Sequence, residues 1–235
     1  MPASPETRAL RITVNPLVQV SALLDEPASA RACLVLAHGA GAGMHHAFLA
    51  ATALGLAQRG IATLRYQFPY LERGSKRPDA PALAHATVRA AVGEAARLLP
   101  GLPLLAGGKS FGGRMTSQAQ AAGALPGVCG LVFIGFPLHP AGKPGTERAA
   151  HLVDVKLPML FLQGTRDELA ALELLQPVVD ALGARATLAL LADADHSFHV
   201  PARSGRTDAE VLEALLDTLI TWFDALPAAA PSAPR

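Results

Sequence analysis

Three residues that lie far apart in the sequence have the side chains that nucleophilic catalysis requires. Ser110 lies in the pentapeptide GKSFG, residues 108–112, which matches the G-x-S-x-G pattern of a nucleophile elbow. A serine hydroxyl is a good nucleophile only when a base takes its proton, and a third group must orient that base. On an elbow fold the carboxylate and then the histidine follow the serine along the chain. Asp167 and His196 follow Ser110 in that order.

Asp167 and His196 each come after a predicted buried strand. The strand MLFLQ ends shortly before Asp167, and ATLALL ends shortly before His196. Because ligands bind beyond the carboxyl ends of such strands, we expect the three side chains to meet at one edge of a sheet. Asp167 could instead cap the following helix, and His199 could replace His196 as the base. The rival carboxylates are Glu168, Asp193 and Asp195.

The loop HGAGAG, residues 38–43, follows another predicted strand and is a candidate for binding an oxyanion. Acyl transfer needs backbone N–H donors aimed at the developing negative charge. The amide of Phe111, directly after the nucleophile, is one expected donor. The second is the amide of Ala40 or of Gly41, and His38 is expected to brace this loop. The loop lacks the full G-x-G-x-x-G spacing of a dinucleotide-binding turn.

A nucleotide site at residues 108–110 is disfavoured. The letters GKS match the end of a phosphate-binding loop, but that pattern requires glycine at position 103, where this chain has Pro103. A zinc site is also disfavoured, because His45 and His46 are adjacent on one segment and no Cys or carboxylate cluster accompanies them. We therefore expect neither a metal nor a cofactor.

Apolar side chains in two strand-end loops are candidates for an acyl pocket. They could equally be ordinary core residues, since large apolar side chains are usually buried. These candidates are Phe68, Tyr70, Phe136 and Leu138.

Strands and helices alternate along most of the chain. This alternation predicts an α/β fold with a doubly wound, mostly parallel sheet, and two initial strands split by Asn15-Pro16 predict an antiparallel N-terminal edge. Pro177 predicts a short turn, with a helix that starts close to it. Strands are expected at residues 9–14, 17–24, 33–37, 61–66, 102–106, 128–134, 159–163 and 187–191, and helices at 47–58, 83–99, 111–122 and near 172–182.

The last predicted helix has the clearest pattern. Apolar residues recur at helical spacing from Val211 to Leu226, and Thr207 with Glu210 forms a capping box ahead of them. The residues after it, PAAAPSAPR, have the composition of a disordered tail. We expect a single domain over residues 1–226, no insertion long enough for a large lid domain, and a disordered tail over 227–235.

The amino-acid composition gives little indication of macromolecular partners. The chain of 235 residues is 51% hydrophobic and 17% charged, with a formal net charge of +1. This balance gives no general electrostatic reason to bind nucleic acid or an anionic membrane. Cys33 and Cys129 lie in apolar runs and are expected to be buried thiols rather than a disulfide. The first residues lack a secretory signal, so a cytoplasmic protein is expected; the oligomeric state is left open.

Five segments together resemble the α/β-hydrolase superfamily, near its dienelactone-hydrolase branch. They are HGAGAGMHHAF, GKSFGGRM, GFPLHPAGKP, LQGTRDEL and ADHSF. More narrowly, they are similar to a hydrolase family that bacterial proteins of this size share with animal testis-expressed protein 30 and a subunit of the NSL acetyltransferase complex. The resemblance extends from Leu34 to Phe223 and implies the α/β-hydrolase fold, with Ser110, Asp167 and His196 as the triad. Dienelactone hydrolases have cysteine in place of Ser110, so their substrate is not implied.

The expected activity is that of a serine hydrolase that cleaves a small to medium carboxylic ester or thioester through an acyl-enzyme. Peptidase or acyltransferase activity would use the same residues. The alternative from another class is a non-catalytic interaction module that retains the fold, since a fold alone does not determine function.

Overall fold

The computed structural model describes residues 6–227. Eight strands and six α-helices alternate along this part of the chain, with three short 3₁₀ helices between them. The strands are β1 (Glu6–Asn15), β2 (Val18–Glu26), β3 (Ala32–Ala37), β4 (Ile61–Tyr66), β5 (Leu104–Lys109), β6 (Val128–Ile134), β7 (Met159–Gly164) and β8 (Ala186–Leu191). The α-helices are α1 (Ala47–Gln58), α2 (Pro69–Glu72), α3 (Pro81–Leu98), α4 (Phe111–Ala122), α5 (Leu172–Leu182) and α6 (Asp208–Asp224). The 3₁₀ helices are Glu147–Asp154, Gly183–Arg185 and Ala202–Ser204.

The strands form one sheet in the order β1-β2-β4-β3-β5-β6-β7-β8. Strand β2 is antiparallel to both of its neighbours, β1 and β4. The other adjacent pairs, from β4 to β8, are parallel. The doubly wound, mostly parallel sheet and its antiparallel N-terminal edge are therefore confirmed.

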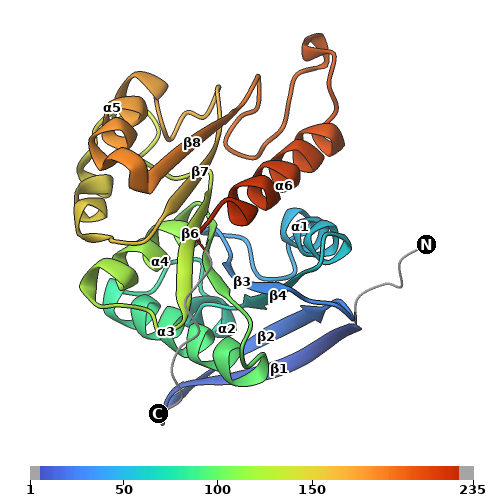
Figure 1. Cartoon of the computed structure of the whole chain (residues 1–235). Coiled ribbons are helices and arrows are strands. Elements are labelled where there is room, and N and C mark those ends of the chain that lie inside the picture. The colour runs from blue at the N-terminus through green and yellow to red at the C-terminus, as the bar shows by residue number, and fades with distance from the viewer. Residues whose placement is uncertain (1–5, 228–235) are drawn as a thin grey trace.

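Helices cover both faces of the sheet (Figure 1). Alternate residues of β3 point to opposite faces: Cys33 and Val35 join the apolar core beneath α3, α4 and α5, whereas Leu34 and Leu36 join the core beneath α1 and α6. All six residues of β3 are buried, as expected for a strand covered on both sides. Within the described residues, these helices and the connecting loops leave no separate lid domain.

The strand order reverses beside β3, and this reversal positions the site. The chain passes from β3 to β4 on one side and returns to β5 on the other. The loops that leave the carboxyl ends of β3 and β5 therefore diverge and leave a crevice between them, the usual ligand site of an open α/β sheet. The glycine-rich loop after β3 and the elbow after β5 face each other there.

The prediction around Pro177 was wrong. Helix α5 runs without a break from Leu172 to Leu182 and contains Pro177. Proline removes the hydrogen bond that its N–H would donate to the carbonyl of Glu173, but both residues are exposed, so water can satisfy that carbonyl. On the opposite face, Leu175 and Val179 are buried and hold the helix against the sheet.

The other differences are small. The loop expected after β4 contains the one-turn helix α2, and β5 extends to Lys109 rather than ending at residue 106.

Both cysteines are free, but only Cys33 is buried; Cys129 is half-buried. The capping box of Thr207 and Glu210 is confirmed at the start of α6. Of the predicted disordered tail, all but Pro227 lies outside the described residues. Over residues 6–227, every helix is too short or too polar to cross a membrane.

Candidate active site

The elbow places Ser110 in a strained conformation between β5 and α4. Its φ is 50° and its ψ is −116°, a combination that side-chain-bearing residues rarely adopt. Glycines make this turn possible: a Cβ at Gly112 would lie 2.6 Å from the backbone oxygen of His38, and a Cβ at Gly108 would collide with Ala37. The Ser110 N–H donates a 3.1 Å hydrogen bond to the carbonyl of Ile134, which ties the turn to β6.

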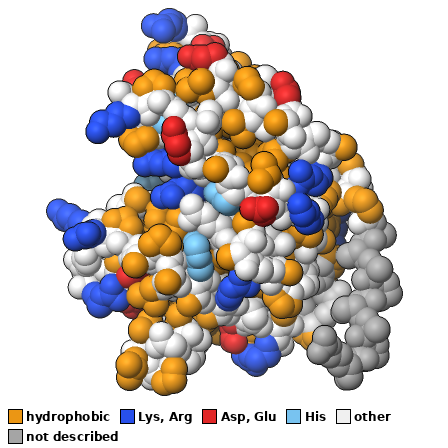
Figure 2. Space-filling view, turned by 90° about the vertical axis from the view of Figure 1, so that its left-hand side faces the viewer, with side chains coloured by type: hydrophobic (Ala, Val, Ile, Leu, Met, Phe, Trp, Pro, Cys, Tyr) orange, Lys and Arg blue, Asp and Glu red, His pale blue; other side chains and the backbone are white. Residues whose placement is uncertain are grey.

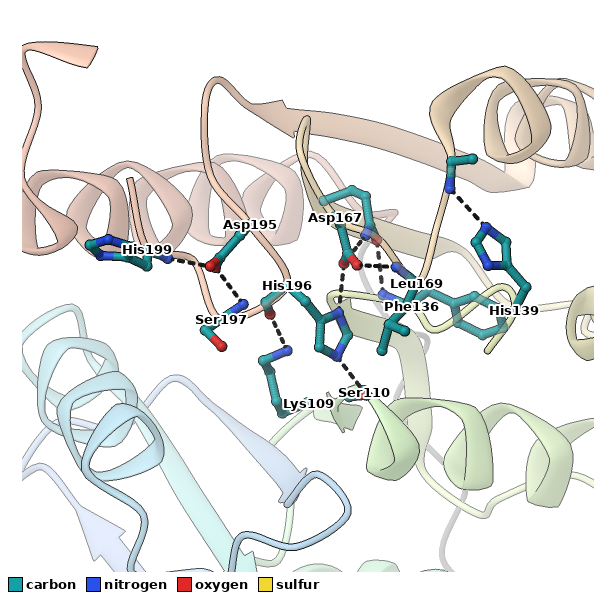
Figure 3. Close-up of polar contacts among 12 residues, drawn as sticks. Lys109, Ser110, Phe136, His139, Asp167, Leu169, Asp195, His196, Ser197 and His199 are labelled. Atoms are coloured by element: carbon teal, nitrogen blue, oxygen red, sulfur yellow. Dashed lines mark hydrogen bonds and ion pairs between the residues drawn. The ribbon is translucent and has the colours of Figure 1, made fainter. Parts of the chain in front are cut away.

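The structure brings Ser110, His196 and Asp167 into one chain of hydrogen bonds (Figure 3). His196 Nε2 lies 2.8 Å from Ser110 Oγ, and His196 Nδ1 lies 2.7 Å from Asp167 Oδ2. An ionised carboxylate accepts only, so Nδ1 carries the proton and Nε2 is free to accept one from the serine. This is the arrangement in which an imidazole can act as a general base towards a hydroxyl.

Asp167 is fully enclosed by groups that hold its carboxylate in place. Its side chain is 0% exposed. Oδ1 accepts a 2.8 Å hydrogen bond from the backbone N–H of Leu169, and Oδ2 accepts from the side-chain amide of Gln163 as well as from His196. The expected alternative, that Asp167 caps a helix, does not apply, because α5 has Ala171 as its N-cap.

The rival base and the rival carboxylate Asp195 lie elsewhere in the same loop. The His199 side chain is 64% exposed, and its ring contacts Asp208 rather than Ser110. That contact raises the pKa of His199. The Asp195 carboxylate accepts hydrogen bonds from the N–H groups of Ser197 and His199 and thereby shapes the loop that carries His196 (Figure 3).

The two candidate N–H donors in the loop after β3 differ in whether they already have an acceptor. The Gly41 N–H already donates to the hydroxyl of Tyr70, at 3.3 Å. The Ala40 N–H has no hydrogen-bond partner in the described part of the chain, and Ala40 lines the same pockets as Ser110. Phe111 is the first residue of α4, so its N–H is one of the unpaired donors at a helix N-terminus.

His38 braces this loop, as expected. Its Nε2 accepts a 3.0 Å hydrogen bond from the N–H of Phe68, which leaves Nδ1 to donate to the carbonyl of Gly39 at 2.8 Å. Burial lowers the pKa of His38 to about 4, so the ring stays neutral and keeps this tautomer. His46 caps the start of α1 instead of approaching His38. Within residues 6–227, His, Cys, Asp and Glu form no cluster of three that could hold a metal ion.

Lys109 is a residue of the site that the sequence reasoning missed. Its ammonium donates a 2.6 Å hydrogen bond to the backbone carbonyl of His196 and lies 5.4 Å from the ring centre of Phe198. Desolvation lowers the pKa of Lys109 to about 8, although the charges of Asp167 and Asp195 oppose this shift. The sequence indicates Lys109 only by its position beside Ser110, within the letters GKS that partly match a phosphate-binding loop.

The predicted acyl-pocket residues must be corrected. Each has an exposed fraction of at most 1%, and none lines the two pockets that open beside Ser110. They belong to the buried apolar core. The residues concerned are Phe68, Tyr70, Phe136 and Leu138.

Two pockets meet at Ser110. The first has a volume of about 320 Å³, and its lining includes His196, Ser197, Phe48 and Leu49. The second has a volume of about 440 Å³ and extends past Phe111. Both include Ala40, Ser110 and Leu169, so a molecule attacked by the hydroxyl can extend in two directions.

Solved structures with the same fold share nearly the whole length of this chain. A dienelactone hydrolase from Anabaena variabilis superposes with a TM-score of 0.77 at 22% identity, over 95% of this chain and 99% of that one. An α/β serine hydrolase without a lid from Xanthomonas campestris has a TM-score of 0.71 at 23% identity, over 96% and 97% of the two chains. A serine hydrolase homologue from Coxiella burnetii has a TM-score of 0.73 at 20% identity, over 90% and 97%.

The sequence itself matches a family model described as an alpha/beta hydrolase domain. The match covers residues 30–224, from the start of the central strands to the end of the last helix. It therefore includes both loops that face Ser110 and the segments that carry Asp167 and His196. The chain belongs to the alpha/beta hydrolase domain family.

Proposed function

We propose that this protein is a serine hydrolase that cleaves a small to medium carboxylic ester or thioester through an acyl-enzyme. The observation that carries the proposal is the continuous chain of hydrogen bonds from Ser110 through His196 to Asp167. A buried carboxylate that orients an imidazole, which in turn contacts a serine hydroxyl, has the geometry that acyl transfer requires.

In the first half of the reaction, His196 Nε2 takes the proton of Ser110 as Oγ attacks the carbonyl carbon. The negative charge that develops on the carbonyl oxygen is received by the N–H groups of Phe111 and Ala40. Asp167 stabilises the imidazolium that forms. His196 then gives its proton to the departing alkoxide or thiolate, and the acyl group remains on Ser110.

In the second half, water attacks the acyl-enzyme. His196 takes a proton from that water, a second oxyanion forms in the same place, and the bond to Ser110 Oγ breaks. The serine recovers its proton from His196, and a carboxylic acid is released. The pockets of about 320 Å³ and 440 Å³ support a substrate of modest size, because a larger one would extend into solvent.

The test uses a fluorophosphonate, which phosphonylates activated serines with loss of fluoride. We expect the probe to label the wild-type protein at Ser110, as mapped by mass spectrometry, and to leave Ser110→Ala unlabelled. Hydrolysis of short-chain esters and thioesters should disappear in the same variant. A protein that keeps Ser110 unmodified at high probe concentration is not an activated serine hydrolase.

The same experiment separates the enzyme from the non-catalytic module. A non-catalytic interaction module should bind a partner protein stably and turn over neither esters nor thioesters. Peptidase and acyltransferase activities would retain labelling at Ser110 and are distinguished by adding peptides or acceptor alcohols to the assay.

A further inference from the structure

The two pockets beside Ser110 differ in which catalytic group they contain. His196 lines only the first pocket, whereas the second pocket contains Phe111 and Met115 together with two arginines, Arg114 and Arg148. On the proposed function, His196 must deliver a proton to the leaving oxygen, so the leaving group lies on its side, in the first pocket. The acyl part of the substrate then occupies the second pocket.

The two arginines of the second pocket have no acidic partner. Arg114 lies on α4, and its backbone N–H donates to the carbonyl of Ser110, which places it one helical turn from the nucleophile. Arg148 belongs to the 3₁₀ helix Glu147–Asp154. Neither guanidinium forms an ion pair with any residue between 6 and 227. The buried Arg114 Nε also lacks a hydrogen-bond acceptor.

The two guanidinium groups are close enough to affect each other. Burial, followed by the positive charge of Arg148, lowers the pKa of Arg114. Burial is the main cause that lowers the pKa of His151, and the positive charge of Arg114 lowers it further. The repulsion between these two cations, added to the desolvation of Arg114, is unfavourable and is reduced when an anion lies near both. A negatively charged group bound in the second pocket would relieve this repulsion.

The carboxylate that also lines this pocket does not supply that charge. Asp79 pairs with Arg73 at 2.7 Å and accepts a hydrogen bond from the N–H of Tyr70 at 2.9 Å. Its side chain is 1% exposed, so it is already compensated and enclosed. On the face shown in Figure 2 the molecule is indented at one edge, and Lys and Arg side chains lie on both sides of the indentation.

We propose that the second pocket binds an acyl chain that ends in a carboxylate, held by Arg114 and Arg148. The preferred substrates are then monoesters of short dicarboxylic acids rather than neutral esters. Guanidinium groups suit this role because they donate paired hydrogen bonds to a carboxylate. The side chain of Phe111, which lines this pocket, packs against the methylene groups between the ester and the charge.

The kinetic test compares the monomethyl and dimethyl esters of succinic, glutaric and adipic acid, with methanol release as the assay. For the best chain length, we expect kcat/KM for the monomethyl ester to exceed that for the dimethyl ester by roughly tenfold or more, as for a charge-assisted hydrogen bond. Arg114→Gln and Arg148→Gln should each remove most of this preference while hydrolysis of the dimethyl ester continues. Arg203→Gln, which removes an exposed arginine elsewhere, should retain it.

A binding experiment separates failure of this inference from failure of the proposed function. Monomethyl glutarate is titrated calorimetrically into Ser110→Ala and into the double variant with Arg114→Gln. Binding that the second substitution abolishes supports the anionic pocket, even if no methyl ester is turned over. Equal turnover of charged and neutral esters, together with no binding, overturns the anionic pocket and leaves the serine hydrolase intact.

Discussion

The Lys109 ammonium donates a 2.6 Å hydrogen bond to the backbone carbonyl of His196. Lys109 precedes Ser110 in the chain, so the nucleophile's strand is joined directly to the loop that carries the base. The same ammonium lies 5.4 Å from the ring centre of Phe198, which adds a cation–π contact to that loop. These two contacts fix the distance between the β5 strand end and the His196 loop.

We expect Lys109→Met to lower kcat by about tenfold or more, because a loosened His196 loop places the imidazole less accurately against Ser110. Lys109→Arg should restore part of the loss, since a guanidinium can also donate to the His196 carbonyl. Steady-state kinetics on one ester, with unfolding midpoints for each variant, make the comparison. An unchanged kcat in a folded Lys109→Met protein contradicts the positioning role.

The lowered pKa of Lys109 also predicts how stability depends on pH. The pKa falls from an ordinary value of 10.5 to about 8 in the folded protein, mainly through desolvation. Between these two values the unfolded chain binds more protons, so the free energy of unfolding gains a contribution that increases as pH rises. Urea titrations from pH 7.5 to 10 should show this increase in the wild type relative to Lys109→Met. Parallel profiles would mean that Lys109 titrates normally.

The two histidines of the same loop should behave very differently. His196→Ala should reduce kcat by about a thousandfold or more, since it removes the proposed base. His199→Ala should leave turnover within about twofold, because its ring contacts Asp208 and not Ser110. The two variants are a matched pair, with identical substitutions three residues apart. The reverse result would make His199 the base.

Acid should destabilise the protein before its carboxylates titrate. Burial is the main cause that lowers the pKa of both His38 and His151 from 6.5 to about 4. In this window the unfolded chain binds more protons, so the free energy of unfolding falls as pH is lowered. In His38→Gln the fall should be shallower by up to about 1.4 kcal/mol per pH unit. Arg203→Gln, which changes an exposed residue that does not titrate in this window, is the control, and the slope of its profile should match the wild type.

The elbow glycine Gly112 should be intolerant of even a methyl group. A Cβ there would lie 2.6 Å from the backbone oxygen of His38, so we expect Gly112→Ala to destabilise by about 2 kcal/mol or more. Gly93 is an exposed helical glycine with nothing within 4 Å of a new Cβ. Gly93→Ala should therefore stabilise by about 0.5 to 1 kcal/mol. Denaturant unfolding of both variants measures the difference, and equal effects would argue against close packing at the elbow.

Local patterns in the sequence were sufficient to predict much of this fold. The alternation of strands and helices, the capping box at Thr207 and the turn at Ser110 each depend on residues a few positions apart. Such patterns reflect short-range sterics and hydrogen bonding, which a sequence displays directly. Pro177 shows the limit: whether a helix tolerates a proline depends on which side faces water, and that is a tertiary property.

The order Ser110, Asp167, His196 and the position of each after a strand were likewise evident in the sequence, because parallel strands end at a common edge. What only the tertiary structure decided were contacts between distant segments. In the folded protein the Gly41 N–H donates to the Tyr70 hydroxyl, and Phe136 is buried in the core. The Lys109 ammonium donates to the His196 carbonyl, and Arg114 lies near Arg148. Each contact depends on how loops from different strands pack against one another. The spacing of residues within a single segment does not predict such packing.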